Sequence, residues 1–399
     1  MEHSLKVKFS RKGVFLYLIL APFFLPRGFL EYIDSYKTFV NLWLLISCIV
    51  ISFLFVIKAL AQKLLIKKSV FFMLLYYSVF LIETVRSQGT IISGYQKLIV
   101  TPLFGLFFVV FLQEYKKEIV NAISNFLIML FVLNLTIFNP VFWPDYFSFS
   151  MVSFIGHIQL VSQISLFGCY IAVLKNREKT KYSAVFLVVL SLITLFLSKA
   201  SLGYIVIFML IISFLCYKTK FLRSIFMQKT QIYILAYSIL NVIMFWYSNN
   251  LKHFLWLNKY IDYSFSGRTF IWQEAIELIK QQPWFGYGAY GVNIVMFWHE
   301  WLNAGLGMNY AHNEILQRLL DGGIILLICF ILFLWFYGKN VNNLKDDKVK
   351  YFSNSCYMIF LLIMVSESVT EYYYFIAFLS IVCCLSNDDE SKGRIIKIR

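Results

Sequence analysis

The stretch AHNEILQRLLDGGIILLICFILFLWFY, residues 311–337, decides the fold, because a long apolar run follows directly on a polar start. Residues 314–337 are long enough to cross the hydrocarbon core of a bilayer, which takes about 20 residues of α-helix. Asn313 is a favourable N-cap, and Glu314 is a favourable acid for a first turn. The stretch therefore predicts a transmembrane helix with a histidine, His312, at its polar edge.

Composition extends this conclusion to the whole chain. Of its 399 residues, 60% are hydrophobic and 14% are charged, whereas a soluble domain has about 25% charged residues. We therefore predict an all-α polytopic membrane protein with about 12 transmembrane helices and one large loop that contains short amphipathic helices. The predicted spans are 14–30, 38–57, 69–83, 97–113, 119–138, 151–174, 182–197, 201–217, 231–247, 314–337, 351–366 and 371–386.

Basic residues predict the orientation of these spans. Lys and Arg cluster at every second loop, and basic residues beside spans stay on the cytoplasmic side of a membrane. This pattern predicts that both termini are cytoplasmic. The net charge of +15 then reflects topology and lipid contact, and it gives no indication of nucleic acid binding.

The predicted organisation has four parts. An N-terminal transmembrane bundle of about nine helices covers residues 1–247, and an extracytoplasmic functional loop covers 248–313. About three C-terminal transmembrane helices cover 314–386, and a cytoplasmic tail covers 387–399.

Within the large loop, residues 269–282 have apolar residues at helical spacing on one face and polar residues largely on the other. Pro283 ends this pattern. A short amphipathic helix of this kind lies in the membrane interface or caps the bundle. It holds Arg268 at its N-terminus, where free backbone N–H groups add to the guanidinium charge and suit an anion. The alternative is that Arg268 pairs with Asp262 or with a lipid phosphate.

The segment Gly286–Gly291 matches GxGxxG, but it follows an amphipathic helix and lacks the strand that a dinucleotide site needs. We interpret it as a flexible loop whose tyrosines, Tyr287 and Tyr290, offer ring faces to a sugar.

His312 is a candidate general base, because a histidine with an ordinary pKa of about 6.5 can accept a proton from a hydroxyl. Beyond it, Glu314, Arg318 and Asp321 lie on one face of the predicted helix. Charges within a span face a cavity or one another. The alternative to a binding role is an intrahelical ion pair between Glu314 and Arg318.

Two further polar features face the same side in the predicted topology. The turn Ser198–Ser201 puts Lys199 near the membrane surface, where it is a candidate phosphate ligand, and Glu367 lies in the turn before the last span. A packing or topological role is the alternative for Glu367. All seven cysteines fall in apolar spans or at their edges, so no disulfide framework or cysteine metal site is indicated.

An ordered set of motifs resembles the O-antigen ligase and polymerase superfamily of bacterial envelope proteins. The set is Ser266-Gly267-Arg268 with Trp272, then Pro283 with Gly286 and Gly288, then His312-Asn313 with Leu316, Asp321 and Gly323. Two positions depart from the family pattern, because Lys199 and Asp321 stand where arginine and glutamate are usual. The first departure matters more, since lysine cannot make the bidentate phosphate contact of arginine.

The resemblance implies a metal-independent, inverting glycosyltransferase of the bacterial cytoplasmic (inner) membrane, with a periplasmic site, no cofactor and undecaprenyl-pyrophosphate-linked oligosaccharide as donor. His312 and Arg268 are the expected catalytic residues, with charge on the leaving pyrophosphate stabilised by basic side chains. An extracytoplasmic site has no nucleotide sugars, which agrees with a lipid-linked donor. The expected substrate-binding residues are Lys199, Arg318, Asn313, Glu314, Tyr287, Tyr290 and Glu367.

The acceptor stays open between two activities. The missing arginine and the aromatic, Ile-rich composition favour a repeat-unit polymerase of O-antigen or capsule over a ligase that transfers glycan to lipid A core. A chain-length regulator and a flippase are the expected partners, beside membrane lipid. A transporter is the competing class, but it predicts broken or repeated segments around a midplane site, and no repeat is evident.

Overall fold

The computed structural model describes residues 11–61, 66–87, 89–149, 151–176, 181–250, 268–294 and 310–386. The tail 387–399, most of the loop 248–313, and Ser266 and Gly267 of the first motif lie outside these ranges. The described residues form helices and turns, with one isolated antiparallel bridge between Val152 and His157 and no strand. The predicted all-α polytopic class is confirmed.

Seven helical segments of the described residues are long and apolar enough to cross a membrane. Four shorter apolar helices, 13–24, 182–197, 201–217 and 374–385, coincide with other predicted spans. The long segment 91–135 covers two predicted spans, and its helix changes direction at Tyr115, whose φ and ψ of −127° and 35° are not helical. The seven long segments are Asp34–Leu60, Lys68–Arg86, Ile91–Leu135, Ile158–Lys175, Thr230–Asn249, Glu314–Asn342 and Asp347–Ser366.

The chain divides into two compact units. The first unit comprises residues 1–57 and 107–208, and the second comprises 58–106 and 209–399. The first unit contains α1 (Arg11–Leu20), η1 (Ala21–Phe24), η2 (Gly28–Glu31), most of α2 (Asp34–Leu60), the later part of α5 (Thr101–Leu135), α6 (Ile158–Lys175), α7 (Lys181–Leu197) and the start of α8 (Ser201–Tyr217).

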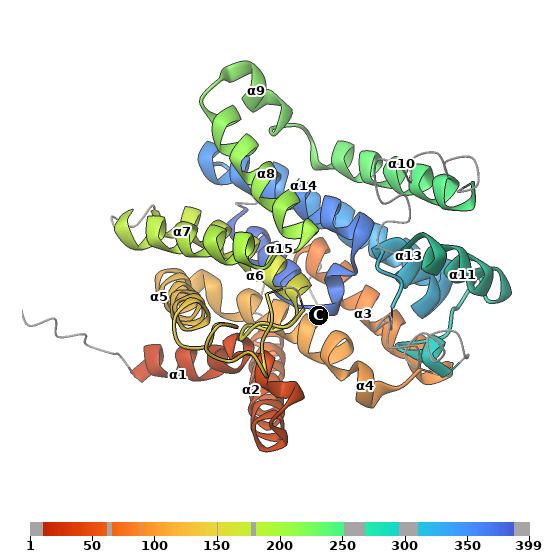
Figure 1. Ribbon diagram of the computed structural model, residues 1–399, viewed down its shortest axis with the longest axis horizontal. Coiled ribbons are helices and arrows are strands. Elements are labelled where there is room, and N and C mark those ends of the chain that lie inside the picture. The colour runs from red at the N-terminus through yellow and green to blue at the C-terminus, as the bar shows by residue number, and fades with distance from the viewer. Residues whose placement is uncertain are drawn as a thin grey trace, which may run out of the picture. The chain divides into compact units, whose positions relative to one another are not determined.

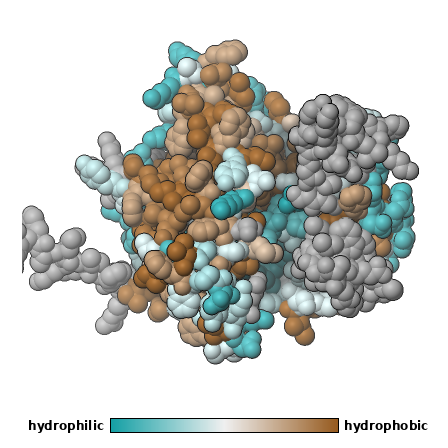
Figure 2. All heavy atoms as spheres, viewed as in Figure 1, coloured by the Kyte–Doolittle hydropathy of each residue, from teal (hydrophilic) through white to brown (hydrophobic). Residues whose placement is uncertain are grey.

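In the first unit α6 packs along α7, and almost every residue of α6 is buried (Figure 1). The α6 helix begins at Ile158, whereas the sequence predicted a span from residue 151. Residues 151–157 instead form a turn, because Gly156 has a φ of +140° and exchanges backbone hydrogen bonds with Ser153 at 2.9 Å. Figure 2 shows apolar side chains over α7, whose outer residues Val185 and Phe196 are 62% and 63% exposed, as expected for a lipid-facing helix.

The second unit is built around α13 (Glu314–Asn342), which packs against several other helices of the unit (Figure 1). Asn313 caps its N-terminus by accepting a hydrogen bond from the amide of Leu316 at 3.0 Å. The neighbours of α13 are α3 (Lys68–Arg86), α10 (Thr230–Asn249), α11 (Arg268–Gln281), α14 (Asp347–Ser366) and α15 (Tyr374–Leu385). The unit also contains α4 (Ile91–Tyr95), the π-helical turn η3 (Gln96–Val100), α9 (Lys220–Ile225), η6 (Gly291–Ile294) and η7 (Val369–Glu371).

The α13 helix is interrupted after two turns. Gly322 and Gly323 have non-helical backbone angles, and the φ and ψ of 62° and −161° at Gly323 belong to a region that only glycine adopts readily. The segment 283–288 fills the interruption. The carbonyls of Leu320 and Asp321 accept hydrogen bonds from the amides of Tyr287 and Gly288, and the amide of Ile324 donates to Pro283. Backbone groups that the break would leave unpaired inside a membrane protein are thereby satisfied.

Candidate functional site

His312 lies immediately before α13 and is only 8% exposed. Its Nδ1 is 3.3 Å from Oε2 of Glu367, and its ring packs on the ring of Tyr310 with 4.1 Å between centroids. The backbone of His312 has a φ of 47°, in the left-handed region that non-glycine residues rarely adopt. The surrounding structure therefore holds this side chain in a specific orientation against a carboxylate.

Glu367 follows the end of α14 and is 1% exposed. Burial alone would raise the pKa of its carboxyl, but the charge and hydrogen bond of His312, together with weaker influences, hold that pKa below its ordinary value. The charge of Arg268 and a hydrogen bond from Tyr310 act in the same direction. Glu367 is thus a carboxylate at neutral pH that contacts His312 and interacts electrostatically with Arg268.

Arg268 begins α11, and its position is fixed by the contacts of that helix. The indole of Trp272 donates a hydrogen bond of 3.0 Å to the carbonyl of Ala311, the residue before His312. Trp272 is fully buried, in a cluster with Leu316 and Leu320 of α13. This packing anchors the helix that carries Arg268 to the helix start that carries His312.

Behind His312, the first two turns of α13 carry a buried network of charges. Arg318 has no exposed surface, and its guanidinium nitrogens lie 3.0 Å from Glu314 and 3.2 Å from Asp321. A third nitrogen donates to the hydroxyl of Tyr76 at 2.9 Å. The predicted Glu314–Arg318 ion pair is confirmed, within a network larger than that pair.

The network continues to η7 and to the π-helical turn η3. Lys97 lies 2.9 Å from Glu371 and 3.7 Å from Asp321, and its ammonium sits 4.0 Å from the ring centroid of Tyr290. The hydroxyl of Tyr290 donates to Glu371 at 3.2 Å. The negative charge of Glu371 is the main reason why the pKa of Tyr290 is raised, with burial second. Tyr290 therefore stays a neutral hydrogen-bond donor.

Several predicted substrate contacts have protein partners instead. Asn313 is fully buried, and its amide donates to Asn241 at 2.6 Å and to the carbonyl of Val365 at 2.8 Å. Glu314 is also fully buried and accepts two hydrogen bonds from Thr370, at 2.6 and 3.1 Å. Asn313, Glu314 and Arg318 are therefore enclosed by protein partners in this structure, and their contact with substrate stays a prediction.

Tyr287 is enclosed as well. Its side chain is 4% exposed within the apolar cluster of α11 and α13, and its hydroxyl donates to the carbonyl of Leu278 at 2.9 Å. The contact of its ring with a sugar stays a prediction. Tyr287 and Gly286 belong to the segment that fills the break in α13.

Among the residues that the structure describes, only three other than glycine have a positive φ. They are Lys199, Tyr290 and His312, with φ of 51°, 56° and 47°. All three belong to the residues predicted for the site from sequence. Backbone strain of this kind costs roughly 1–3 kcal/mol per residue and is concentrated at functional sites, so it is a reason, independent of any motif, to examine these residues. Lys199 belongs to the first unit, and its ammonium lies 5.8 Å from the ring centroid of Phe149.

The sequence interpretation did not include Tyr310, Lys97 or Glu371 in the site. Lys97 had a readable signal, because a lone charge at the start of an apolar run needs a partner in a membrane protein. Tyr310 had none, since nothing in its neighbours shows that its ring packs on His312.

Comparison with known proteins agrees with this arrangement. Residues 186–331 match a family model described as O-antigen ligase. A protein of Rickettsia conorii named "Putative polysaccharide ligase" is 26% identical over 224 residues, which are 53% of this chain and 52% of that protein. A protein of the same name from Rickettsia felis is 29% identical over 119 residues, 27% of this chain and 28% of that protein.

The region 186–331 of this chain is thus similar to the O-antigen ligase family, and the chain is similar to polysaccharide ligases over the aligned residues. It spans about half the length, or less, of these two curated relatives. The region that matches the family model contains Lys199, Arg268, Tyr290 and His312, whereas Glu367 lies beyond it. Three of those four residues are the strained ones, so the family match and the backbone geometry select the same part of the chain.

Proposed function

We propose that this chain is a membrane glycosyltransferase that moves glycan from undecaprenyl pyrophosphate to an acceptor hydroxyl, on the outer side of a bacterial cytoplasmic membrane. The observation that carries the proposal is the pairing of His312 with the buried carboxylate of Glu367 at a strained backbone position. The similarity to the O-antigen ligase family and the topology predicted from basic residues support the lipid-linked donor.

The pair assigns the tautomer of His312. A carboxylate only accepts hydrogen bonds, so Nδ1 of a neutral imidazole carries the hydrogen that faces Glu367, 3.3 Å away. The lone pair on Nε2 is then available to take a proton from an acceptor hydroxyl. Glu367 stabilises the imidazolium that forms, as a buried carboxylate does behind a catalytic histidine.

In the proposed step the acceptor oxygen loses its proton to Nε2 and attacks C1 of the donor sugar. The bond between C1 and the pyrophosphate oxygen breaks, and undecaprenyl pyrophosphate leaves with the electron pair and a net inversion at C1. Arg268 stabilises the negative charge that develops on the leaving group. Lys199, which belongs to the first unit, stays a phosphate ligand predicted from the sequence. Glu314, Arg318 and Asp321 act through position, because they hold the helix start that carries His312.

Two acceptors fit this reaction, and each has an observation in its favour. Lys199 in place of the usual arginine, with the aromatic composition, favours a repeat-unit polymerase, which extends one lipid-linked repeat with another. The similarity to the O-antigen ligase family and to the polysaccharide ligases of Rickettsia favours a ligase. A ligase moves finished glycan onto lipid A core.

A gel of surface lipopolysaccharide, with a blot for lipid-linked glycan, tests both the reaction and the acceptor. Cells that lack the gene are complemented with wild type, with His312→Ala or with the control His253→Ala, and the amount of membrane protein is matched. Core that carries a single repeat in the His312→Ala strain indicates a polymerase, whereas bare core with accumulated lipid-linked polymer indicates a ligase. An unchanged ladder in that strain rejects glycosyl transfer and favours transport.

A further inference from the structure

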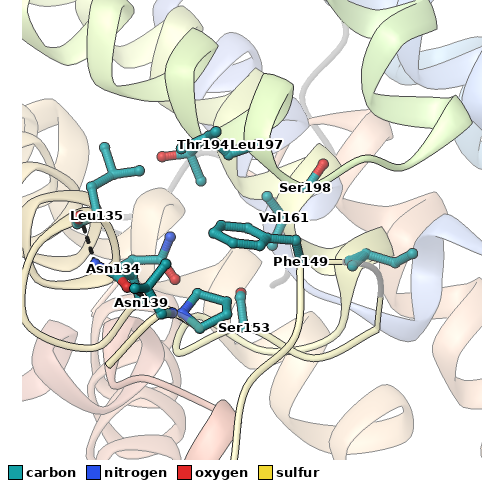
Figure 3. Close-up of a pocket in the computed structure, with 12 residues that line it drawn as sticks. Asn134, Leu135, Asn139, Phe149, Ser153, Val161, Thr194, Leu197 and Ser198 are labelled. Carbon is teal, nitrogen blue, oxygen red and sulfur yellow. Dashed lines mark hydrogen bonds between the residues drawn. The ribbon is translucent and has the colours of Figure 1, made fainter. Parts of the chain in front are cut away.

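The first unit contains a pocket that the proposed reaction does not use (Figure 3). Its volume is about 180 Å³, below the roughly 300 Å³ at which sites for drug-sized ligands begin. Figure 3 shows the ring of Phe149 in the middle of the pocket-lining side chains, with Asn134, Ser153 and Thr194 around it. Most of the remaining wall is apolar, and it includes Pro140 and Val161.

Two polar atoms in this wall have no hydrogen-bond partner. They are Oδ1 of Asn134 and Oγ1 of Thr194, in side chains that are 8% and 2% exposed. The hydroxyls of Ser153 and Ser198, by contrast, donate to backbone carbonyls at 3.1 and 2.7 Å. Buried polar groups are nearly always paired, so the two open atoms point to a ligand that supplies hydrogen bonds.

We propose that this pocket binds one sugar ring of the glycan, a step that rests on the proposed function. A sugar presents C–H groups on one face, which suit the electron-rich face of Phe149, and it carries hydroxyl or acetamido groups at its edge. Such a donor hydrogen-bonds to Oδ1 of Asn134, and the hydroxyl of Thr194 pairs with an oxygen of the same ring. The apolar wall accepts the methyl of an acetamido group.

The location agrees with a glycan subsite. In the topology predicted from basic residues, the segment 139–157 and the turn 198–201 both lie on the outer side of the membrane, as does the loop 248–313. Lys199 follows Ser198 directly, and its ammonium lies 5.8 Å from the ring centroid of Phe149. A cation beside the pocket places the ring next to a phosphate, so the sugar that binds here is the one linked to the lipid pyrophosphate.

An acyl or isoprenoid chain is the competing occupant of the pocket. A hydrocarbon chain binds better to an apolar wall, whereas a sugar needs the polar atoms of that wall. A hydrocarbon leaves Asn134 and Thr194 unpaired, and unpaired buried polar atoms weaken binding. Replacing either residue by an apolar residue of similar shape therefore weakens a sugar and strengthens a hydrocarbon. The direction of the change separates the two ligands.

The test is equilibrium binding of the methyl glycoside of N-acetylglucosamine to the full chain in nanodiscs, measured by saturation-transfer NMR. Thr194→Val and Asn134→Leu each remove one hydrogen-bonding atom and nearly keep side-chain volume. Each is expected to weaken binding about five- to tenfold, the effect of one hydrogen bond. The control is Asn125→Leu, because Asn125 lies on the same helix α5 with an exposed side chain bonded to Tyr17. Its binding is expected to equal that of wild type.

Three results overturn the pocket proposal: no sugar signal with wild type, binding by both pocket variants as tight as that of wild type, or displacement of the sugar by decyl phosphate that grows stronger in Thr194→Val. Melting temperatures identify a misfolded variant, and the remaining variant then decides. The His312→Ala chain is expected to bind the sugar as wild type does. Sugar binding without any transfer activity rejects the proposed function and keeps the subsite, whereas transfer without sugar binding rejects the subsite alone.

Discussion

At the scale of single residues, two side chains, His312 and Glu367, have different roles in the proposed general-base catalysis. The imidazole takes the proton, and the carboxylate sets the tautomer. Glu367→Gln is therefore informative, because its amide can donate to Nδ1 and stabilise the wrong tautomer. We expect it to lower kcat by about 10²–10⁴, the range for general-base catalysis, with KM little changed. Glu367→Asp keeps the charge and should retain more activity, as measured by transfer from a lipid-linked donor in vitro. Equal activity of the Gln variant and wild type would contradict the pairing.

The same pair predicts a pH dependence of stability. The lowered pKa of Glu367 means that its ionised form stabilises the native state above the ordinary carboxyl pKa, and that this contribution is lost as pH falls through the lowered value. His312→Ala removes the main opposing influence and leaves burial to raise that pKa. The variant should therefore melt below wild type at neutral pH, and the difference should shrink toward about pH 5 as the buried carboxyl takes up a proton. Melting temperatures in detergent across this range provide the measurement. A difference that is constant with pH would contradict the account.

At the scale of elements, the interruption of α13 joins two motifs that lie far apart in sequence. A Cβ on Gly323 would come within 2.2 Å of the backbone carbon of Trp284, and the φ of 62° is unfavourable for any other residue. Gly323→Ala should destabilise the protein by at least about 2 kcal/mol and lower activity as His312 loses its support. Gly203→Ala is the matched control, because the nearest atom to its Cβ is 3.2 Å away and alanine favours a helix. Thermal unfolding of both variants is the measurement. Equal melting temperatures would contradict the packing of segment 283–288 into the break of α13.

The charge network at the start of α13 gives a second prediction at this scale. Arg318→Met leaves two buried acids, Glu314 and Asp321, and the partly buried Glu371, with Lys97 as the remaining cation among the partners described. Breaking a buried ion pair from one side costs about 3–5 kcal/mol. Arg223→Met removes an exposed pair with Asp347 and should cost less than about 1 kcal/mol. Denaturation midpoints compare the two, and a similar effect of both substitutions would show that the network is not tightly buried.

At the scale of the whole molecule, the distribution of basic residues predicts which side of the membrane holds the site. Alkaline phosphatase fused after Gly291 should be active, because the enzyme folds only outside the cytoplasm. Fused after Asn343, between α13 and α14, it should be inactive. The reverse pattern would place His312 in the cytoplasm and remove the reason for a lipid-linked donor.

Much of this architecture could be predicted from the sequence, because the length of an apolar stretch and the basic residues beside it are local features that determine a membrane span and its orientation. The amphipathic helix before Pro283 and the cap at Asn313 follow from neighbouring residues alone. The contacts of Asn313 with Asn241 and of Lys97 with Glu371 could not be predicted, because they join residues 72 and 274 positions apart. For the same reason, the burial of Glu314, Arg318 and Tyr287 could not be predicted. In a sequence, a polar residue on the exposed face of a helix looks the same as a polar residue that the folded protein encloses.

The interruption of α13 has a mechanical consequence. A continuous helix would transmit every tilt and rotation of its lipid-facing length to His312 as a rigid rod does. Because the rod is cut at Gly322 and Gly323, and the short piece is clamped from the side by segment 283–288 and by Thr370, bending of the longer piece is absorbed at the joint. Changes in bilayer thickness or curvature should therefore leave the His312–Glu367 distance unaltered while the rest of the bundle moves.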